Sequence, residues 1–174
     1  WSYQSLSTAR GLFRIAMPAE LRSRSEFSIR DGRILPDHFT ADDGASSSSK
    51  DQDLRFDWSA GRITGVAEKR RVDLPLKPGV LDTMSVQIAL MHELLVGNTP
   101  RYFVLVDKGR IKDYNYTAVG EQNLVTPIGE FRALIFRSSR PGSDTGTYFW
   151  CAPALGYLPL KVERREGTKV QWSM

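Results

Sequence analysis

The stretch FSIRDGRILPDHFT, residues 27–40, gives the most direct indication of the fold class. Phe27 and Ile29 alternate with polar residues, Asp31-Gly32 follows, and an apolar-rich run then resumes. Alternation with a period of two is typical of a strand that buries one face. An Asp-Gly dipeptide between two such runs predicts a two-residue hairpin turn. These residues therefore predict a pair of antiparallel strands.

Similar runs continue along most of the chain. The further segments with a strand pattern are residues 54–58, 62–68, 101–106, 114–118, 131–135, 147–151, 158–163 and 168–174. Turn-forming residues separate most of these segments, and the Ser-rich stretch 42–51 predicts a loop between two strands. Short strands joined by hairpins predict a mostly antiparallel sheet.

One segment has a helical period instead. The apolar residues that recur at three- and four-residue intervals are Leu81, Met84, Ile88, Met91 and Leu95. They predict a helix over about residues 81–96, capped by Asp82 or Thr83, with one apolar stripe. Such a stripe must be buried against a sheet. We therefore expect a mainly β (α+β) fold, a curved antiparallel sheet or half-barrel with one helix packed on its concave face.

The length and composition fit one globular domain. The chain has 174 residues, of which 41% are hydrophobic and 25% are charged. A core can form at this length without disulfides or a metal. No apolar run approaches the roughly 18 residues that a membrane-spanning helix needs. We expect a single domain over residues 1–174 without a transmembrane segment.

The charge pattern argues against a nucleic-acid partner. The net charge is +4, but the basic residues are scattered, with the densest runs at residues 69–71 and 161–165. The second run contains Glu163 and has the pattern of a solvated strand face. We expect no nucleic-acid partner, and at most a weak attraction to an anionic membrane surface.

Residues that could catalyse a reaction or bind a metal are few. Ser85 and His92 lie seven positions apart on the predicted helix, which separates them by about 10 Å along its axis, too far for proton transfer. His38 and its acidic neighbours fit no zinc or calcium pattern. Cys151 has no neighbouring base and is expected to be a small buried residue. We expect no catalytic residue, no metal and no cofactor.

Three carboxylates keep one enzymatic alternative open. Asp57, Asp82 and Glu121 are candidates for paired-carboxylate hydrolysis because each lies near a turn or a helix start. A helix N-cap, with a contribution of about 1 kcal/mol, would equally explain Asp82. The sequence leaves the roles of these carboxylates and of Ser85 open.

Aromatic residues are concentrated in the second half of the chain. They fit either a sheet face packed with rings or a sheet that encloses an apolar ligand. In the second case, the residues expected to line the cavity are Met84, Ile88, Met91, Tyr116 and Trp150.

Five segments, in this order, carry a family resemblance. They are SEFSIRDGRILPDHF (25–39), FDW (56–58), LDTMSVQIAL (81–90), DKGRIKDYNYTAVGEQNLVTPIGEF (107–131) and YFWCAPALGYLPLKVE (148–163). Together they resemble the bacterial domain-of-unknown-function family 3108. Two departures are Cys151, where a larger apolar residue is expected, and Lys161, which replaces the more usual arginine.

The resemblance implies an exported, periplasmic protein of Gram-negative bacteria, without an established activity, cofactor or catalytic residue. Members of the family usually begin further upstream with a signal peptide. Residues 1–174 are therefore expected to lack N-terminal residues of the full precursor. The expected fold is also similar to that of the half-barrel lipoprotein carriers of the periplasm, although a fold likeness is a weak guide to function.

We therefore expect an envelope protein that binds an apolar ligand, such as a lipid or an acyl chain, without catalysis. One alternative is an envelope interaction or scaffold protein with a protein partner and no ligand cavity. Another is a hydrolase in which Asp57 and Glu121 converge in a cleft with perturbed pKa values.

Overall fold

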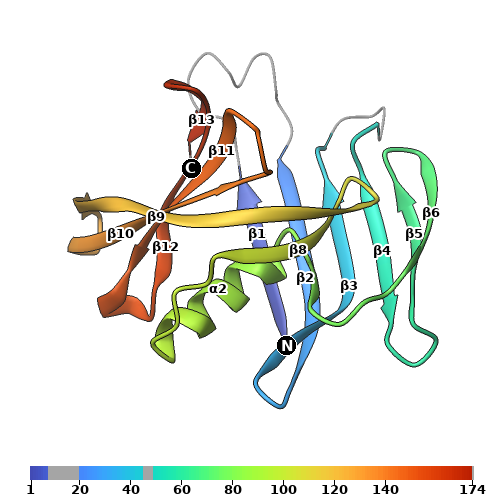
Figure 1. The fold of residues 1–174 in the computed structure, drawn as a ribbon. Coiled ribbons are helices and arrows are strands. Elements are labelled where there is room, and N and C mark those ends of the chain that lie inside the picture. The colour runs from blue at the N-terminus through green and yellow to red at the C-terminus, as the bar shows by residue number, and fades with distance from the viewer. Residues whose placement is uncertain (8–19, 45–48, 174) are drawn as a thin grey trace. The chain divides into compact units, whose positions relative to one another are not determined.

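The computed structural model describes residues 1–7, 20–44 and 49–173, which form two β-sheets and one α-helix. The first sheet has six antiparallel strands in sequence order (Figure 1). They are β1 (Ser2–Ser7), β2 (Leu21–Arg30), β3 (Arg33–Asp42), β4 (Gln52–Asp57), β5 (Arg62–Ala67) and β6 (Arg70–Pro75). The expectation of a mainly β fold with one helix is confirmed for these residues.

The second sheet has seven strands, and these also follow the sequence order. They are β7 (Val80–Asp82), β8 (Tyr102–Asp107), β9 (Arg110–Thr126), β10 (Gly129–Ser139), β11 (Thr145–Ala152), β12 (Leu158–Glu166) and β13 (Lys169–Ser173), with the 3₁₀ turn η1 (Pro153–Leu155) before β12. Neither sheet closes into a barrel within the described residues. The edge strands are β1 and β6 in the first sheet, and β7 and β13 in the second.

The predicted hairpins are confirmed at β2–β3 and β4–β5. Asp31 and Gly32 have φ values of 50° and 71°, as a two-residue type I′ turn requires. Asp57 closes the β4–β5 turn, because its carboxylate accepts hydrogen bonds from the backbone N–H groups of Ser59 and Ala60. Local turn chemistry alone was sufficient to predict both.

Strands β7 and β8 are parallel, which is the exception to the antiparallel pairing of the described strands. Val80 pairs with Val104, and Asp82 pairs with Val106. Parallel neighbours need a crossover connection, and helix α2 (Ser85–Leu95) lies within it. The sequence did not predict β1, β6 or β7. A three-residue strand such as β7 is too short to show a period of two.

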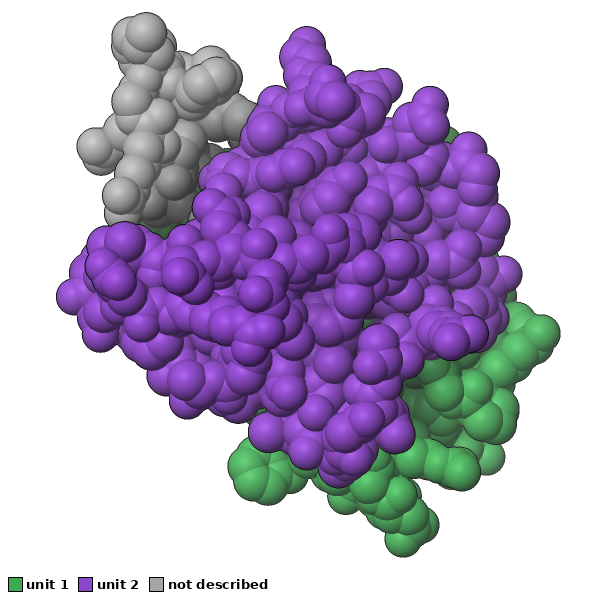
Figure 2. Space-filling model, turned by 60° about the vertical axis from the view of Figure 1, so that its left-hand side comes forward, with its two compact units in different colours: residues 1–88, 104–112 green, residues 89–103, 113–174 purple. Residues whose placement is uncertain are grey.

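The chain divides into two compact units that are interleaved along the sequence (Figure 2). Unit 1 comprises residues 1–88 and 104–112, and unit 2 comprises residues 89–103 and 113–174. The expectation of a single domain over residues 1–174 stays a prediction.

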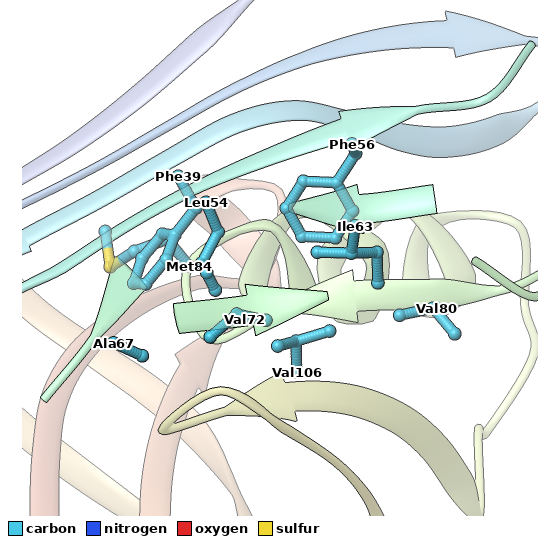
Figure 3. Close-up of a cluster of buried hydrophobic side chains, with 9 residues drawn as sticks. All are labelled: Phe39, Leu54, Phe56, Ile63, Ala67, Val72, Val80, Met84 and Val106. Carbon is cyan, nitrogen blue, oxygen red and sulfur yellow. The ribbon is translucent and has the colours of Figure 1, made fainter. Parts of the chain in front are cut away.

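The core of unit 1 is a cluster of apolar side chains that come from one face of the first sheet, from β7 and β8 and from the turn before α2 (Figure 3). Phe39 and Leu54 pair across β3 and β4, and Ile63 follows on β5. All three are at most 1% exposed, because strand alternation turns them to the same side. The other members of the cluster are Phe56, Ala67, Val72, Val80, Met84 and Val106.

The core of unit 2 includes aromatic rings on one face of strands β9 to β11. Phe136 pairs with Phe149, and Ser138, two positions further along β10, pairs with Tyr116. The three rings of Phe136, Phe149 and Tyr116 therefore point to the same face, and all are buried. The helix residues buried in unit 2 are Ala89, Leu90 and Leu94.

The predicted apolar stripe of the helix is wrong for the residues that are in the helix. Ile88 and Met91 are only partly buried, and Leu95 is 61% exposed. The fully buried apolar residues of α2 are instead Val86, Ala89, Leu90 and Leu94. Leu81 and Met84 are buried, but they precede the first helical residue.

A helical period in the sequence could not distinguish these two sets. At about 100° per residue, the set that contains Leu90 and the set that contains Met91 lie on opposite sides of α2. Both sets have three- and four-residue spacing, so both satisfy the pattern of an amphipathic helix. Packing in the tertiary structure selects the side that is buried.

Candidate functional site

The residues predicted to line an apolar cavity are distributed over several elements. Met84 lies in the packed core of unit 1 and is 6% exposed (Figure 3). Ile88 and Met91 are on the partly buried side of α2. Tyr116 and Trp150 are buried residues of β9 and β11 in unit 2.

Tyr116 and Trp150 lie on opposite faces of their sheet. Tyr116 is on the face of Phe149, and the two rings stack with their centroids 6.3 Å apart. Trp150 follows Phe149 on β11 and therefore points to the other face. A pocket on one face of this sheet thus includes Tyr116 or Trp150, but not both.

The ring of Tyr116 belongs to an apolar aromatic group. The ring of Phe103 contacts it edge-on, with the centroids 5.0 Å apart, a geometry that aromatic pairs favour. Burial raises the pKa of Tyr116, so the phenol is neutral at physiological pH. This face of unit 2 therefore consists mainly of buried aromatic rings, among which lie the hydroxyl groups of Tyr116 and Ser138.

The opposite face contains a cluster of cations and aromatic rings, which we call the cation–aromatic cluster. Its members are Tyr148, Trp150, Lys161, Glu163 and Arg165. The ammonium group of Lys161 lies 4.5 Å from the ring centroid of Trp150, and the guanidinium group of Arg165 lies 4.6 Å from that of Tyr148. These distances are within the range of cation–π interactions.

Glu163 forms ion pairs with both cations of this cluster. Its carboxylate lies 2.6 Å from Lys161 Nζ and accepts a hydrogen bond of 2.8 Å from Arg165 Nε. Burial raises the pKa of Glu163, but the two cations outweigh burial and lower it overall. The prediction of a solvated strand face for residues 161–165 is therefore wrong at Glu163, which is 6% exposed.

The sequence contains a signal for this cluster that the prediction of a solvated strand face overlooked. Lys161, Glu163 and Arg165 alternate in charge at every second position, so they share one strand face. Their cross-strand partners include Tyr148 and Trp150. The pairing of β11 with β12 is a feature of the tertiary structure. It brings the alternating charges of β12 beside the aromatic rings of β11, so these residues form a packed cluster.

Unit 1 contains a second cluster of buried polar residues, which is centred on Asp82. Asp82 Oδ1 accepts hydrogen bonds from the backbone N–H groups of Met84 and Ser85, at 2.7 and 2.8 Å. Asp82 Oδ2 accepts one from the Ser25 hydroxyl group at 2.6 Å. In return, the Asp82 N–H donates to Ser85 Oγ at 3.0 Å. This reciprocal arrangement is a capping box.

The Asp82 carboxylate is fully buried, and burial raises its pKa. Ser25, from β2, is also fully buried and fixes the second carboxylate oxygen. Asp82 therefore joins the start of α2 to the first sheet. Helix capping therefore accounts for the hydrogen bonds of both Asp82 and Ser85.

One family model matches this chain. It is described as "Protein of unknown function (DUF3108)", and it covers residues 1–168. The chain belongs to this family. No curated protein and no solved structure matches the chain. None of the helices in the described part of this family member is long and apolar enough to cross a membrane.

The two carboxylates of the hydrolase alternative have the wrong properties for a general acid. Hydrogen bonds from Ser59 and the backbone of Ala60 lower the pKa of Asp57. An ion pair with Arg132 lowers the pKa of Glu121. A general acid of this type needs a raised pKa. Asp57 belongs to unit 1 and Glu121 to unit 2, and each is already held by local partners.

The remaining reactive residues are engaged in ordinary contacts. His38 Nε2 lies 2.7 Å from Asp53 Oδ1 on the exposed side of the first sheet. Burial raises the pKa of the Cys151 thiol to about 12, so the thiolate form is suppressed. Side-chain oxygens of Asp42, Asp43 and Asp51 lie within 4.8 Å of one another, a spacing that exposed acidic groups also show without a metal.

Proposed function

We propose that this family member is a non-enzymatic binding protein of the bacterial envelope that holds an apolar ligand, such as a lipid or an acyl chain. The observation that carries the proposal is that helix α2 is apolar on two opposite sides. The side that contains Leu90 is buried, whereas the side with Ile88, Met91 and Leu95 is only partly covered.

The chemistry of this second side suits alkyl chains. Met91 is flexible and polarizable and can adapt to ligands of varying shape. Apolar ligand sites are lined mainly by aliphatic and aromatic side chains, with few polar groups. In unit 2, the partly buried Phe103 and the neutral phenol of Tyr116 meet that description. Trp150 faces the other side of the sheet, so the proposed site does not include it.

We further propose a half-barrel arrangement, with the helix on the concave face of a curved sheet and the ligand in the remaining space. It also places the protein in the periplasm of Gram-negative bacteria. The family resemblance supports this location, and a fold of this kind would shield an acyl chain from water.

The first test is native mass spectrometry of the gently purified protein, followed by organic extraction and lipid analysis. We expect a co-purified lipid at a stoichiometric level, or saturable uptake of a fluorescent fatty acid by the apo protein. A clean apo mass together with no uptake of the fatty acid would overturn the proposal.

A pair of variants tests the location of the site. Ile88→Ser with Met91→Ser should weaken fatty-acid binding about tenfold or more, because two apolar contacts are lost. Val125→Ser with Ile128→Ser makes the same chemical change at side chains that are 80% and 72% exposed, and should leave binding unchanged. Circular dichroism of both variants checks the fold. Equal binding by the two variants would contradict the assignment to α2.

One observation favours the scaffold alternative. Strand β13 is an edge strand whose five residues are all exposed, including Val170 and Trp172. An open edge with exposed apolar side chains can pair with a strand of another protein. If the protein takes up no apolar ligand, a Gln171→Pro variant, which blocks strand pairing, tests whether β13 mediates binding to an isolated envelope partner.

A further inference from the structure

Two turns that are distant in the sequence meet in unit 1 (Figure 1). One joins β5 to β6 and includes Glu68, and the other joins β8 to β9 and includes Lys108 and Gly109. The Lys108 ammonium group lies 3.2 Å from the Glu68 carboxylate. A Cβ atom on Gly109 would lie 2.7 Å from Val72 Cγ2 and 3.0 Å from Ala67 Cβ. The second turn therefore packs directly on the β5–β6 hairpin.

The two turns bring basic residues together. Residues 68–71 and 107–112 contain six cations and two carboxylates, a net charge of +4, which equals the net charge of the whole chain. Five of the cations are exposed, and we call them the basic turn patch. They are Lys69, Arg70, Arg71, Lys108 and Arg110. Lys69, Arg70 and Arg110 form no ion pair with any residue that the structure describes.

The backbone of these turns is unusual for the residues it carries. Glu68, Lys69 and Lys108 have φ values of 51°, 64° and 54°. Two-residue hairpin turns with positive φ normally carry Asn or Gly, because a Cβ atom is unfavourable there. Strained backbone of this kind is concentrated at functional sites. Here it places charged side chains at the tips of both turns.

We propose that the basic turn patch docks the protein on the surface of an anionic phospholipid bilayer. Each cation near such a surface adds attraction over about a Debye length. Val66 pairs with Arg71 across β5 and β6 and is 48% exposed. It therefore places an apolar side chain beside Arg71, one of these cations, and apolar side chains beside cations are typical of peripheral membrane binding.

The same features argue against a nucleic acid as the occupant. The segments 68–71 and 107–112 contain no aromatic residue, whereas single-stranded nucleic acids are bound by stacking on aromatic rings. The docking proposal does not depend on the apolar ligand proposed above.

The test is flotation of the full chain with vesicles of phosphatidylcholine alone or with roughly 30% phosphatidylglycerol, at low salt and at about 0.15 M salt. We expect binding only to the anionic vesicles, weakened by salt. Lys69→Glu, Arg70→Glu and Arg110→Glu together should reduce this binding about tenfold or more. A matched control reverses three exposed cations elsewhere in unit 1, Arg30, Arg33 and Lys77. It should change binding by less than about twofold.

Three results would overturn the proposal. They are no binding of the wild-type protein to anionic vesicles at low salt, an equal loss in the control variant, or tighter patch-dependent binding to an RNA or DNA oligonucleotide than to vesicles. Thermal unfolding of both variants verifies that they fold. Uptake of the fluorescent fatty acid is measured in parallel. The patch variant should retain any uptake that the wild type shows, so failure of docking and failure of ligand binding are distinguishable.

Discussion

Asp82 connects a strand, a turn and a helix through a single carboxylate. Replacement by alanine removes the helix cap and leaves the Ser25 hydroxyl group and two backbone N–H groups without their acceptor. We expect Asp82→Ala to lower the free energy of unfolding by about 2–3 kcal/mol. Asp82→Asn keeps an acceptor oxygen and should cost less than about 1 kcal/mol near pH 7. Urea unfolding measures both variants.

The pH dependence of Asp82 has a definite sign. Burial raises the pKa of Asp82 above its ordinary value of 3.8, so the folded protein binds the proton more tightly than the unfolded chain. The resulting stability is fully present below the ordinary value and is lost as the pH rises through the raised pKa. The wild type should therefore gain stability relative to Asp82→Asn as the pH falls from about 7 to about 4. A gain in the stability of Asp82→Asn relative to the wild type over this pH range would contradict the raised pKa of Asp82.

The turn at Glu68 and Lys69 gives a second prediction at the level of single residues. Both residues have positive φ, a conformation that costs about 1–2 kcal/mol for a residue with a Cβ atom. Glu68→Asn with Lys69→Gly should therefore raise the free energy of unfolding by about 1 kcal/mol, measured by thermal unfolding. Substitution of Asp31-Gly32 by Asn-Gly is the control, because that turn already has a favourable sequence. A destabilised variant would show that the turn is not strained.

Strand β12 illustrates how an element depends on charge balance. Glu163 is nearly buried between Lys161 and Arg165, which are each about one-third exposed. Glu163→Gln leaves the two cations to repel each other and should cost about 1–2 kcal/mol, less than a fully buried pair because solvent screens the cations. Glu166→Gln, an exposed position on the same strand, should change stability by less than about 0.5 kcal/mol. Urea unfolding compares the two.

The acid sensitivity of Glu163 is opposite to that of Asp82. The two cations lower the pKa of Glu163 overall, in spite of its burial. Its contribution to stability is present above the ordinary value of 4.5 and is lost as the pH falls through the lowered pKa. The cost of Glu163→Gln should accordingly shrink below about pH 4. A cost that does not vary with pH would mean that the ion pairs contribute nothing.

Helix α2 offers a direct test of which side is buried. Leu90 is 1% exposed and Leu95 is 61% exposed. Leu90→Ala should cost about 2–5 kcal/mol, because it leaves a cavity in the core. Leu95→Ala should cost less than about 0.5 kcal/mol. If chemical unfolding showed the larger cost at Leu95, the helix would be rotated by about half a turn from the orientation described.

The two units share helix α2 and strand β9, and we expect this sharing to make the whole molecule unfold in one step. Helix α2 begins in unit 1 and ends in unit 2, and β9 likewise has residues in both. A helix of 11 residues is marginal by itself in water, so loss of one unit removes its support. We expect a single unfolding transition that coincides in tryptophan fluorescence and far-UV circular dichroism. Leu54→Ala, in the core of unit 1, should move both signals together. Two separate transitions would contradict this.

The sequence could predict those elements whose cause is local. The β2–β3 hairpin follows from Asp31-Gly32 and alternation, and the start of the helix follows from the Asp82 cap. The sequence did not predict β7, because a strand of three buried residues is too short to show a period of two. For the candidate site, the sequence singled out Met84, Ile88, Met91, Tyr116 and Trp150. It could not show that Met84 belongs to a packed core, or that the last two lie on opposite sides of a sheet.

The sequence by itself determined the features that depend on local chemistry. These are the turn residues, the period of two, a capping carboxylate, and the ordered segments that mark the family. These features depend on residues only a few positions apart, so the sequence alone is enough to predict them. The orientation of α2, the burial of Glu163 between two cations, and the meeting of the β5–β6 and β8–β9 turns depend on residues far apart in sequence. They were settled only when the strands paired and the side chains packed, because the same local pattern is compatible with either side of a helix or either face of a strand being buried.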